Sequence, residues 1–216
     1  QAARFGAEMR DGSIVKADFS SRPFHLTDER DNEIEAETVI IATGASAKYL
    51  GLADEEKYRG QGVSACATCD GAFYRDVPVC VVGGGDSACE EAMFLTRFAS
   101  RVYLIHRRDT LRASKIMAER TLSNEKIFPM WNSTIVSYKT DDKGELEAVM
   151  LKDVVEGDET ELPVKCVFMA IGHTPNTSFL GDLVDRDDAG YIIRKTGMMA
   201  TRTPGLFAAG DVADPH

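Results

Sequence analysis

The stretch of residues 78–105 constrains the fold more than any other part of the sequence. Residues 78–82 form a short apolar run, and the glycine-rich turn Gly83-Gly84-Gly85-Asp86-Ser87-Ala88 follows it with the pattern GxGxxA. Small and apolar residues then recur at helical spacing at Ala88, Ala92, Leu95 and Ala99, and residues 102–105 form a second apolar run. Strand, glycine turn, helix and strand in this order predict a βαβ unit of a parallel sheet.

A glycine turn between a strand and a helix is typical of nucleotide sites. The glycines let the backbone approach a pyrophosphate, whose charge suits the helix N-terminus, and a small third residue lets the helix pack on the strand. We therefore predict that Gly83, Gly85, Asp86, Ser87 and Ala88 contact a dinucleotide. For Asp86, a structural role at the start of the helix is the simpler interpretation.

Basic side chains follow the second strand of this unit, where an NAD-binding protein usually carries an acid for the ribose hydroxyl. The sequence there is His106-Arg107-Arg108, with Arg112 close behind. Guanidinium groups at this point suit a 2′-phosphate, so we predict NADPH as the nucleotide. The alternative is a solvated basic face, to which we assign Arg97, Arg101, Lys115 and Arg120.

Two cysteines stand shortly before the glycine turn, in Cys66-Ala67-Thr68-Cys69-Asp70-Gly71. A CxxC pair can close a small disulfide or supply half of a zinc site, but the sequence has no second CxxC or CxxH pair. An acid next to the pair and a dinucleotide site behind it favour thiol–disulfide exchange, although Asp70 could also cap a helix. We interpret Cys80, Cys89 and Cys166 as small core residues.

Charge and composition exclude several classes of protein. The formal net charge of −10 argues against a nucleic-acid partner, and the apolar runs are far shorter than the about 20 residues of a membrane-spanning helix. Five cysteines without regular spacing are unlike a secreted disulfide framework and favour a reducing compartment. No metal site is predicted. We expect a cytoplasmic protein.

Outside the βαβ unit, apolar runs that end in glycine recur at residues 39–44, 167–172 and 206–210. Glycine at the end of a strand lets a ligand approach the backbone, although at any one place it can simply turn the chain. We also expect the end of a helix over residues 2–10, a hairpin of residues 14–17 and 23–26, and a connection over residues 49–62. Strands at 135–138, 146–149 and 151–155 would form a β-meander.

Taken jointly, these motifs resemble those of the low-molecular-weight thioredoxin reductases, homodimeric flavoproteins among the pyridine nucleotide-disulfide oxidoreductases. The resemblance extends over the whole chain. The segments that carry it are residues 42–45, 65–71, 83–85, 106–108 with Arg112, 170–173 with Pro175-Asn176, and 209–211. It implies an α/β fold of two nested Rossmann-like domains. An NADPH domain at residues 49–170 would be inserted into a discontinuous FAD domain at residues 1–48 and 171–216.

The resemblance also implies a mechanism in which electrons pass from NADPH through FAD and a Cys66/Cys69 disulfide to thioredoxin. Cys69 would face the flavin, Cys66 would attack the thioredoxin disulfide, and Asp70 would move protons. The residues implied for FAD are Thr43, Gly44, Gly210 and Asp211. The stretches near Tyr49 and Gly172 would be the hinge between two orientations of the NADPH domain.

The chain also departs from the family pattern. Family members begin with a GxGxxG unit for FAD, which nothing before Val39 supplies, and they continue past the position of His216. We therefore expect a fragment without its N-terminal FAD-binding βαβ unit and its C-terminal end. Two alternatives stay open: a related flavin reductase of a peroxiredoxin or another dithiol carrier, and a noncatalytic NADP-binding module.

Overall fold

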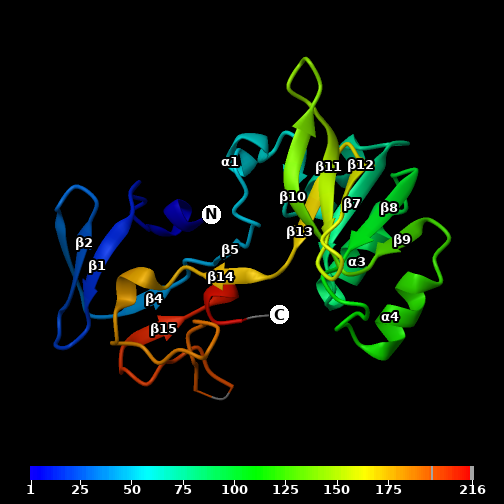
Figure 1. The fold of residues 1–216 in the computed structure, drawn as a ribbon. Helices are drawn as coiled ribbons and strands as arrows, with labels where there is room; N and C mark the ends of the chain where they lie inside the picture. Colours follow the sequence, from blue (N-terminus) through cyan, green and yellow to red (C-terminus); the bar gives the residue numbers. More distant parts are fainter. Residues whose placement is uncertain (196, 215–216) are drawn as a thin grey trace. The chain divides into compact units, whose positions relative to one another are not determined.

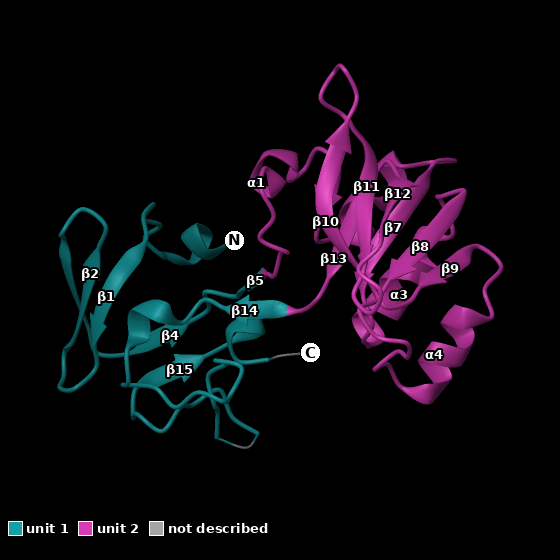
Figure 2. Ribbon diagram, viewed as in Figure 1, with its two compact units in different colours: residues 1–46, 173–216 teal, residues 47–172 magenta. Residues whose placement is uncertain are grey.

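The computed structural model describes residues 1–195 and 197–214, and the chain forms two compact units (Figures 1 and 2). Unit 2 consists of residues 47–172, and unit 1 consists of residues 1–46 together with 173–216. One continuous α/β unit is thus inserted into a discontinuous one. The predicted α/β class and nesting are confirmed.

Unit 2 is built on a parallel five-stranded sheet with the order β6-β13-β7-β8-β9. Its elements are α1 (Glu55–Tyr58), β6 (Val63–Ser64), α2 (Ala67–Asp70), η2 (Gly71–Phe73), β7 (Pro78–Gly83), α3 (Asp86–Leu95), β8 (Arg101–Ile105), α4 (Lys115–Leu122), β9 (Ile127–Met130), β10 (Ser133–Thr140), β11 (Leu146–Asp153), β12 (Glu159–Pro163) and β13 (Val167–Ala170). The predicted strand, glycine turn, helix and strand are β7, the 83–88 turn, α3 and β8.

Both faces of the parallel sheet are buried, and the alternation along β7 shows how. Val79 and Val81 pack with Phe168 and the small face of α3, whereas Cys80 and Val82 pack with the antiparallel strands β10 to β12. Because successive side chains of a strand point to opposite faces, a sheet covered on both sides has continuously apolar strands. This explains why residues 78–82 contain no charged side chain.

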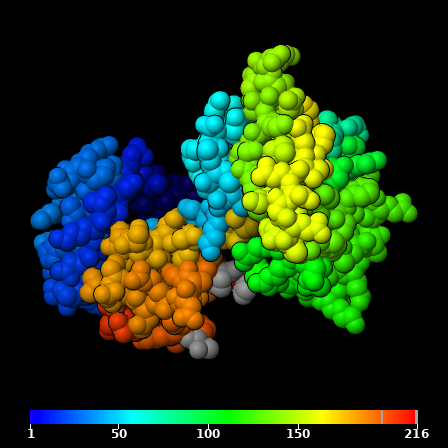
Figure 3. Space-filling view, in the orientation of Figure 1, coloured from blue at the N-terminus to red at the C-terminus, as the bar shows by residue number. Residues whose placement is uncertain are grey.

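The antiparallel sheet β10-β11-β12 differs from the predicted meander. Residues 146–149 and 151–155 were expected to be two strands, but β11 runs unbroken from Leu146 to Asp153, and the third strand is β12. The chain turns after Asp153, whose carboxylate accepts hydrogen bonds from the amides of Val155 and Glu156. The turn at residues 141–144 between β10 and β11 projects from the surface of unit 2 (Figures 1 and 3).

Unit 1 contains shorter elements: η1 (Ala2–Phe5), β1 (Ile14–Asp18), β2 (Phe24–Asp28), β3 (Glu33–Ala36), β4 (Val39–Ile41), β5 (Ala45–Ala47), β14 (His173–Pro175), η3 (Ser178–Leu180), β15 (Leu206–Ala208) and η4 (Gly210–Val212). The hairpin β1-β2 is confirmed and continues into β3, while β4 pairs in parallel with β15. The expected helix over residues 2–10 is wrong, because only a 3-10 turn at Ala2–Phe5 forms there.

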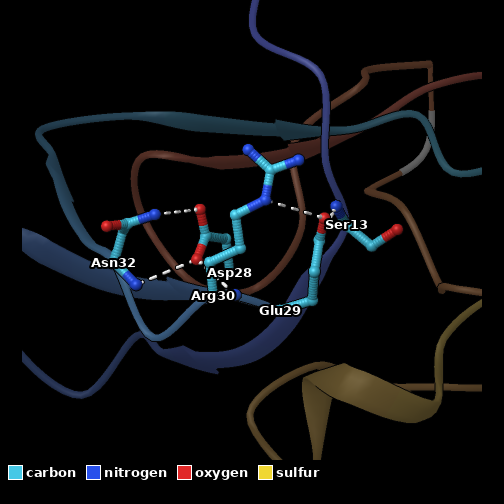
Figure 4. A network of polar contacts seen from close by, with 5 residues as sticks. All are labelled: Ser13, Asp28, Glu29, Arg30 and Asn32. Carbon is cyan, nitrogen blue, oxygen red and sulfur yellow. Dashed lines mark hydrogen bonds and ion pairs between the residues drawn. The ribbon is translucent and has the colours of Figure 1, made fainter.

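The turn between β2 and β3 is held by side chains rather than by an apolar core (Figure 4). The Asp28 carboxylate accepts hydrogen bonds from the amides of Arg30 and Asn32 and from the Asn32 side chain, at 2.8 to 2.9 Å. These bonds lower the pKa of Asp28, the side-chain bond from Asn32 most of all. Glu29 accepts from the Ser13 amide, so the turn is tied to the segment before β1.

Among the described residues, no helix is both long and apolar enough to cross a membrane.

Candidate active site

The two cysteines of the CxxC motif form a disulfide at the short helix α2. The Cys66 and Cys69 sulfurs are bonded, and Cys66 is the N-cap residue of the helix. The Cys69 amide donates to the Cys66 sulfur at 3.2 Å, and the Asp70 amide donates to the Cys66 carbonyl at 3.1 Å. The motif is therefore wound into a single turn. Cys69 is exposed and Cys66 is half-buried, so a reaction partner can reach the disulfide.

Asp70 is the last residue of α2, and its carboxylate is hydrogen-bonded to a residue of the parallel sheet. Ser64, at the end of β6, donates its hydroxyl hydrogen to Asp70 Oδ2 at 2.6 Å and accepts from the Cys66 amide at 3.1 Å. Asp70 therefore does not act as the N-cap of α2, a role that Cys66 fills. The sequence predicted Asp70 as a site residue but gave no indication of Ser64.

A buried thiol and a phenol lie beside the Asp70 carboxylate. Burial raises the pKa of Cys166 to about 12, and the negative charge of Asp70 adds to this shift. Burial and the neighbouring Cys166 raise the pKa of the Tyr74 hydroxyl as well. Both groups are neutral at physiological pH, because these pKa values lie far above it. Cys166, Cys80 and Cys89 are buried free thiols, as predicted for core residues.

The glycine turn after β7 is crowded at its first two positions and open at its third. A Cβ atom at Gly83 would lie 2.4 Å from the Ala170 carbonyl oxygen and 2.7 Å from the Ala88 Cβ atom. A Cβ at Gly84 would lie 2.3 Å from the ring of His106, whereas a Cβ at Gly85 would meet nothing within 4 Å. Close packing therefore requires the first two glycines, and the third leaves space above the N-terminus of α3.

A cavity of about 300 Å³ lies at the carboxyl ends of β7, β8 and β13. It is lined by Leu50, Val82, Gly83, Gly84, Ile105, His106, Arg107, Arg112, Ser133, Thr134, Ala170 and Ile171. In open α/β sheets, ligands bind at this end of the strands. The structure thus brings the predicted glycine turn and two of the three predicted arginines to one cavity.

The three arginines are exposed, and among the described residues none of them forms an ion pair. Arg108 does not line the cavity. The loop that carries Arg112 is bound to the glycine turn, because the amides of Arg112 and Ala113 both donate to the Gly84 carbonyl, at 2.6 and 3.1 Å. A guanidinium without an acidic partner is suited to an anion from outside the chain.

His106 lies inside the protein. Only 5% of it is exposed, its ring packs against Gly84, and its Nε2 atom is buried without a partner among the described residues. Burial lowers the pKa of His106, and the charges of Arg112, Arg108 and Arg107 lower it further. The ring is therefore neutral at pH 7 and supports the glycine turn from the side of β8.

Asp86 and Ser87 are exposed in the first turn of α3. The Asp86 carboxylate accepts hydrogen bonds from the amide and the hydroxyl of Ser114, both at 2.9 Å. Ser114 is the N-cap residue of α4 and follows the arginine loop, so Asp86 connects that loop to α3. This arrangement is a structural role of the kind that the sequence favoured for Asp86.

The residues predicted for the flavin lie at the ends of two paired strands in unit 1. Thr43 and Gly44 follow β4, Gly210 and Asp211 follow β15, and Ile41 pairs with Ala208 in the parallel register. Asn176 joins this region, because its side chain donates to the Thr43 carbonyl at 2.9 Å and its carbonyl accepts from the Thr43 hydroxyl at 2.8 Å. The Asn176 amide also donates to the Gly44 carbonyl.

Comparison with known proteins identifies the family. A family model described as pyridine nucleotide-disulphide oxidoreductase matches residues 2–216. The chain belongs to the pyridine nucleotide-disulphide oxidoreductase family, and its similar relatives include thioredoxin reductases. The resemblance inferred from the motifs is thereby confirmed.

The relatives come from distant organisms. The thioredoxin reductase of Eremothecium gossypii is 48% identical and covers 99% of this chain and 68% of its own length. The mitochondrial thioredoxin reductase 1 of Arabidopsis thaliana is 49% identical, with 99% and 59% covered. Among solved structures, thioredoxin reductase from Giardia duodenalis is 38% identical with a TM-score of 0.81, covering 99% of this chain and 70% of that one. The chain spans 57 to 70% of the length of its curated relatives.

Proposed function

We propose that the protein is an NADPH-dependent thioredoxin-disulfide reductase that uses FAD and the Cys66–Cys69 disulfide. One observation carries the proposal: an accessible disulfide on α2, with a carboxylate at the end of the same helix, lies in the same unit as a nucleotide-type cavity. The similarity to thioredoxin reductases supports the choice of thioredoxin as the partner.

The residues of unit 2 fit a nicotinamide dinucleotide. Gly85 leaves open space at the N-terminus of α3, which favours a phosphate, and the buried Nε2 atom of His106 is unpartnered among the described residues of the cavity wall. Arg107 and Arg112 line that cavity and would bind a 2′-phosphate, with Arg108 beside them. We therefore propose NADPH rather than NADH.

The residues of unit 1 fit a flavin dinucleotide at the strand ends. A Cβ at Gly44 or Gly210 would meet nothing within 4 Å, so both backbones are open to a ligand. Thr43 and Asp211 are exposed beside them and offer a hydroxyl and a carboxylate to the ribityl and pyrophosphate region. FAD, when bound, supplies the two-electron redox chemistry that links a hydride donor to a disulfide.

The thiol chemistry is assigned to three side chains. In the reduced protein, Asp70 takes up the proton of the Cys66 thiol, and the Cys66 thiolate attacks one sulfur of the thioredoxin disulfide to form a mixed disulfide. The other sulfur leaves with that proton from Asp70. The Cys69 thiolate then attacks Cys66, which releases the second thiol of thioredoxin and restores the Cys66–Cys69 disulfide. Two thiols are oxidised and one disulfide is reduced. Homodimer formation and a cytoplasmic location belong to the proposal as well.

The test is NADPH-dependent reduction of thioredoxin by the full-length protein with FAD, compared with its Cys69→Ser variant. We expect the wild type to turn over and the variant to lose at least about 99% of the activity, because the electron-accepting disulfide cannot form. The matched control is Cys89→Ser, which removes a buried thiol in α3. Activity with a peroxiredoxin but none with thioredoxin would contradict the choice of partner, and NADPH binding without electron transfer would contradict the enzyme itself.

A further inference from the structure

We propose that Ser64 is a positioning residue for the thiol exchange, which couples the nucleophilic cysteine to its acid. The inference rests on the proposed function and adds a residue to its site. Ser64 is 6% exposed and lies at the end of β6, where it pairs in register with Phe168 of β13. The position of its hydroxyl is therefore set by the pairing of β6 with β13 and not by the short helix α2.

The hydrogen-bond capacity of one hydroxyl defines the role. A serine hydroxyl carries one hydrogen and two acceptor sites. The hydrogen is directed to Asp70 Oδ2 at 2.6 Å, and the oxygen accepts from the Cys66 amide at 3.1 Å. Ser64 thus binds both ends of α2, the residue that bears the nucleophilic sulfur and the residue that bears the carboxylate.

Few other groups around Asp70 can fix the orientation of its carboxylate. Of its neighbours, Cys166 is buried and Tyr74 is half-buried, and the Asp70 carboxylate has no ion-pair partner among the described residues. A short, charge-assisted bond from Ser64 is therefore the main constraint on its direction. Without this bond, the Asp70 carboxyl group would rotate away from the position in which it protonates the leaving sulfur.

The proposal is tested on the reduced chain without any cofactor. The protein is reduced with dithiothreitol, freed of reductant, and reacted with 2-hydroxyethyl disulfide, whose leaving thiolate is basic and needs a proton. Asp70 takes up the proton of the Cys66 thiol, the Cys66 thiolate attacks this disulfide, and 2-mercaptoethanol leaves with that proton from Asp70. Cys69 then releases a second mercaptoethanol as the protein disulfide closes. The measured quantity is the rate of this exchange between pH 5 and 9.

A double-mutant cycle separates positioning from general support of the fold. Asp70→Asn is expected to slow the exchange about 100-fold, and Ser64→Ala about tenfold. In the Asp70→Asn background, Ser64→Ala should change the rate less than twofold, since no acid is left to orient. Ser64→Thr, which keeps the hydroxyl, should restore the rate to within about threefold, and the remote Ser123→Ala should have no effect.

Each of the other outcomes contradicts either the role of Ser64 or the proposed thiol chemistry. If Ser64→Ala costs tenfold in both backgrounds, Ser64 acts only on the fold of α2 and the inference is wrong. If the wild type does not react or Asp70→Asn has no effect, the proposed thiol chemistry itself fails. Should Ser64→Ala not fold, hydrogen exchange at the Cys66 amide decides the matter. The exchange rate of the Cys66 amide should rise at least about threefold in Asp70→Asn. An unchanged rate would refute the coupling of Cys66 to Asp70 through Ser64.

Discussion

The strand ends that carry the candidate cofactor residues use glycine for different reasons in the two units. After β7 in unit 2, Gly83 and Gly84 are required because neighbouring atoms occupy the space of a side chain, at 2.4 and 2.3 Å. After β4 and β15 in unit 1, Gly44 and Gly210 have open space and adopt φ angles of +67° and +74°. A glycine at a strand end can thus serve internal packing in one unit and backbone conformation beside an open surface in the other.

The polar side chains beside these strand ends act alike in the two units. In unit 2, the loop of Arg112 is bound to the glycine turn through the Gly84 carbonyl and through Asp86. In unit 1, Asn176 binds the backbone and hydroxyl of Thr43 directly. Both arrangements hold a loop at the strand ends with hydrogen bonds to backbone groups. The two units therefore differ in what their glycines require and agree in how these loops are held.

The largest effect should come from Gly83→Ala, because its Cβ would meet the backbone oxygen of Ala170, which cannot move aside. We expect a loss of about 3 kcal/mol in the unfolding free energy. Urea unfolding followed by the fluorescence of Trp131, the single tryptophan, reports on unit 2. The matched control Gly85→Ala should change stability by less than about 1 kcal/mol yet weaken binding of NADPH at least about tenfold. Equal stability of both variants would contradict the packing argument.

A smaller effect is expected at Gly210, where the backbone conformation alone disfavours a side chain. Gly210→Ala should cost about 1 to 2 kcal/mol of stability, because a left-handed residue other than glycine is strained. Asparagine tolerates this conformation better, so Gly210→Asn should cost less than Gly210→Ala. Thermal unfolding of the two variants measures the difference. A cost at Gly210 larger than that at Gly83 would reverse the comparison between the units.

The role of Asp86 can be tested by binding. If its carboxylate acts by holding Ser114, Asp86→Ala and Ser114→Ala should both lower the preference for 2′,5′-ADP over 5′-AMP about threefold to tenfold, through a displaced Arg112 loop. Isothermal titration calorimetry gives both affinities. A change with Asp86→Ala alone would instead indicate that Asp86 contacts the nucleotide itself.

The smallest effect concerns pH. Because burial lowers the pKa of His106 below its ordinary value of 6.5, the unfolded chain takes up a proton that the folded chain resists. The contribution of neutral His106 is fully present above pH 6.5 and is lost as the pH falls below it. Thermal midpoints of the wild type should therefore drop more between pH 7.5 and 5.5 than those of His106→Gln. Equal drops would show that His106 is not held neutral.

The sequence predicts the nucleotide unit well because its signals are local. The apolar run of β7, the three glycines and the small face of α3 follow one another within residues 78–99, and each residue type has a steric reason at its position. The error in the meander has a local cause too. Residues 151–155 were interpreted as a third strand because Leu151, Val154 and Val155 lie in them, but Asp153 and Gly157 form a turn. The outer strand β12 instead exposes Glu159, Thr160 and Glu161 to water.

The contacts that the sequence did not predict join distant segments. Ser64 reaches Asp70 only because β6 pairs with β13, and Asn176 reaches Thr43 across 133 residues of the chain. Asn176 lies in a segment that carries the family resemblance, but no local pattern around Ser64 or Asn176 predicts its hydrogen-bond partner. Such positions follow from strand pairing, which depends on the whole fold rather than on any one stretch.

The most direct test of the central claim is the redox state of the disulfide after addition of NADPH. The full-length protein with FAD is treated anaerobically with NADPH or NADH, quenched with iodoacetamide, and analysed by mass spectrometry. We predict that NADPH leaves both Cys66 and Cys69 alkylated, that equimolar NADH does so far less, and that Cys80, Cys89 and Cys166 stay protected in the folded protein. A disulfide that persists in NADPH would contradict the account, because electrons would then have no route from the nucleotide cavity to α2.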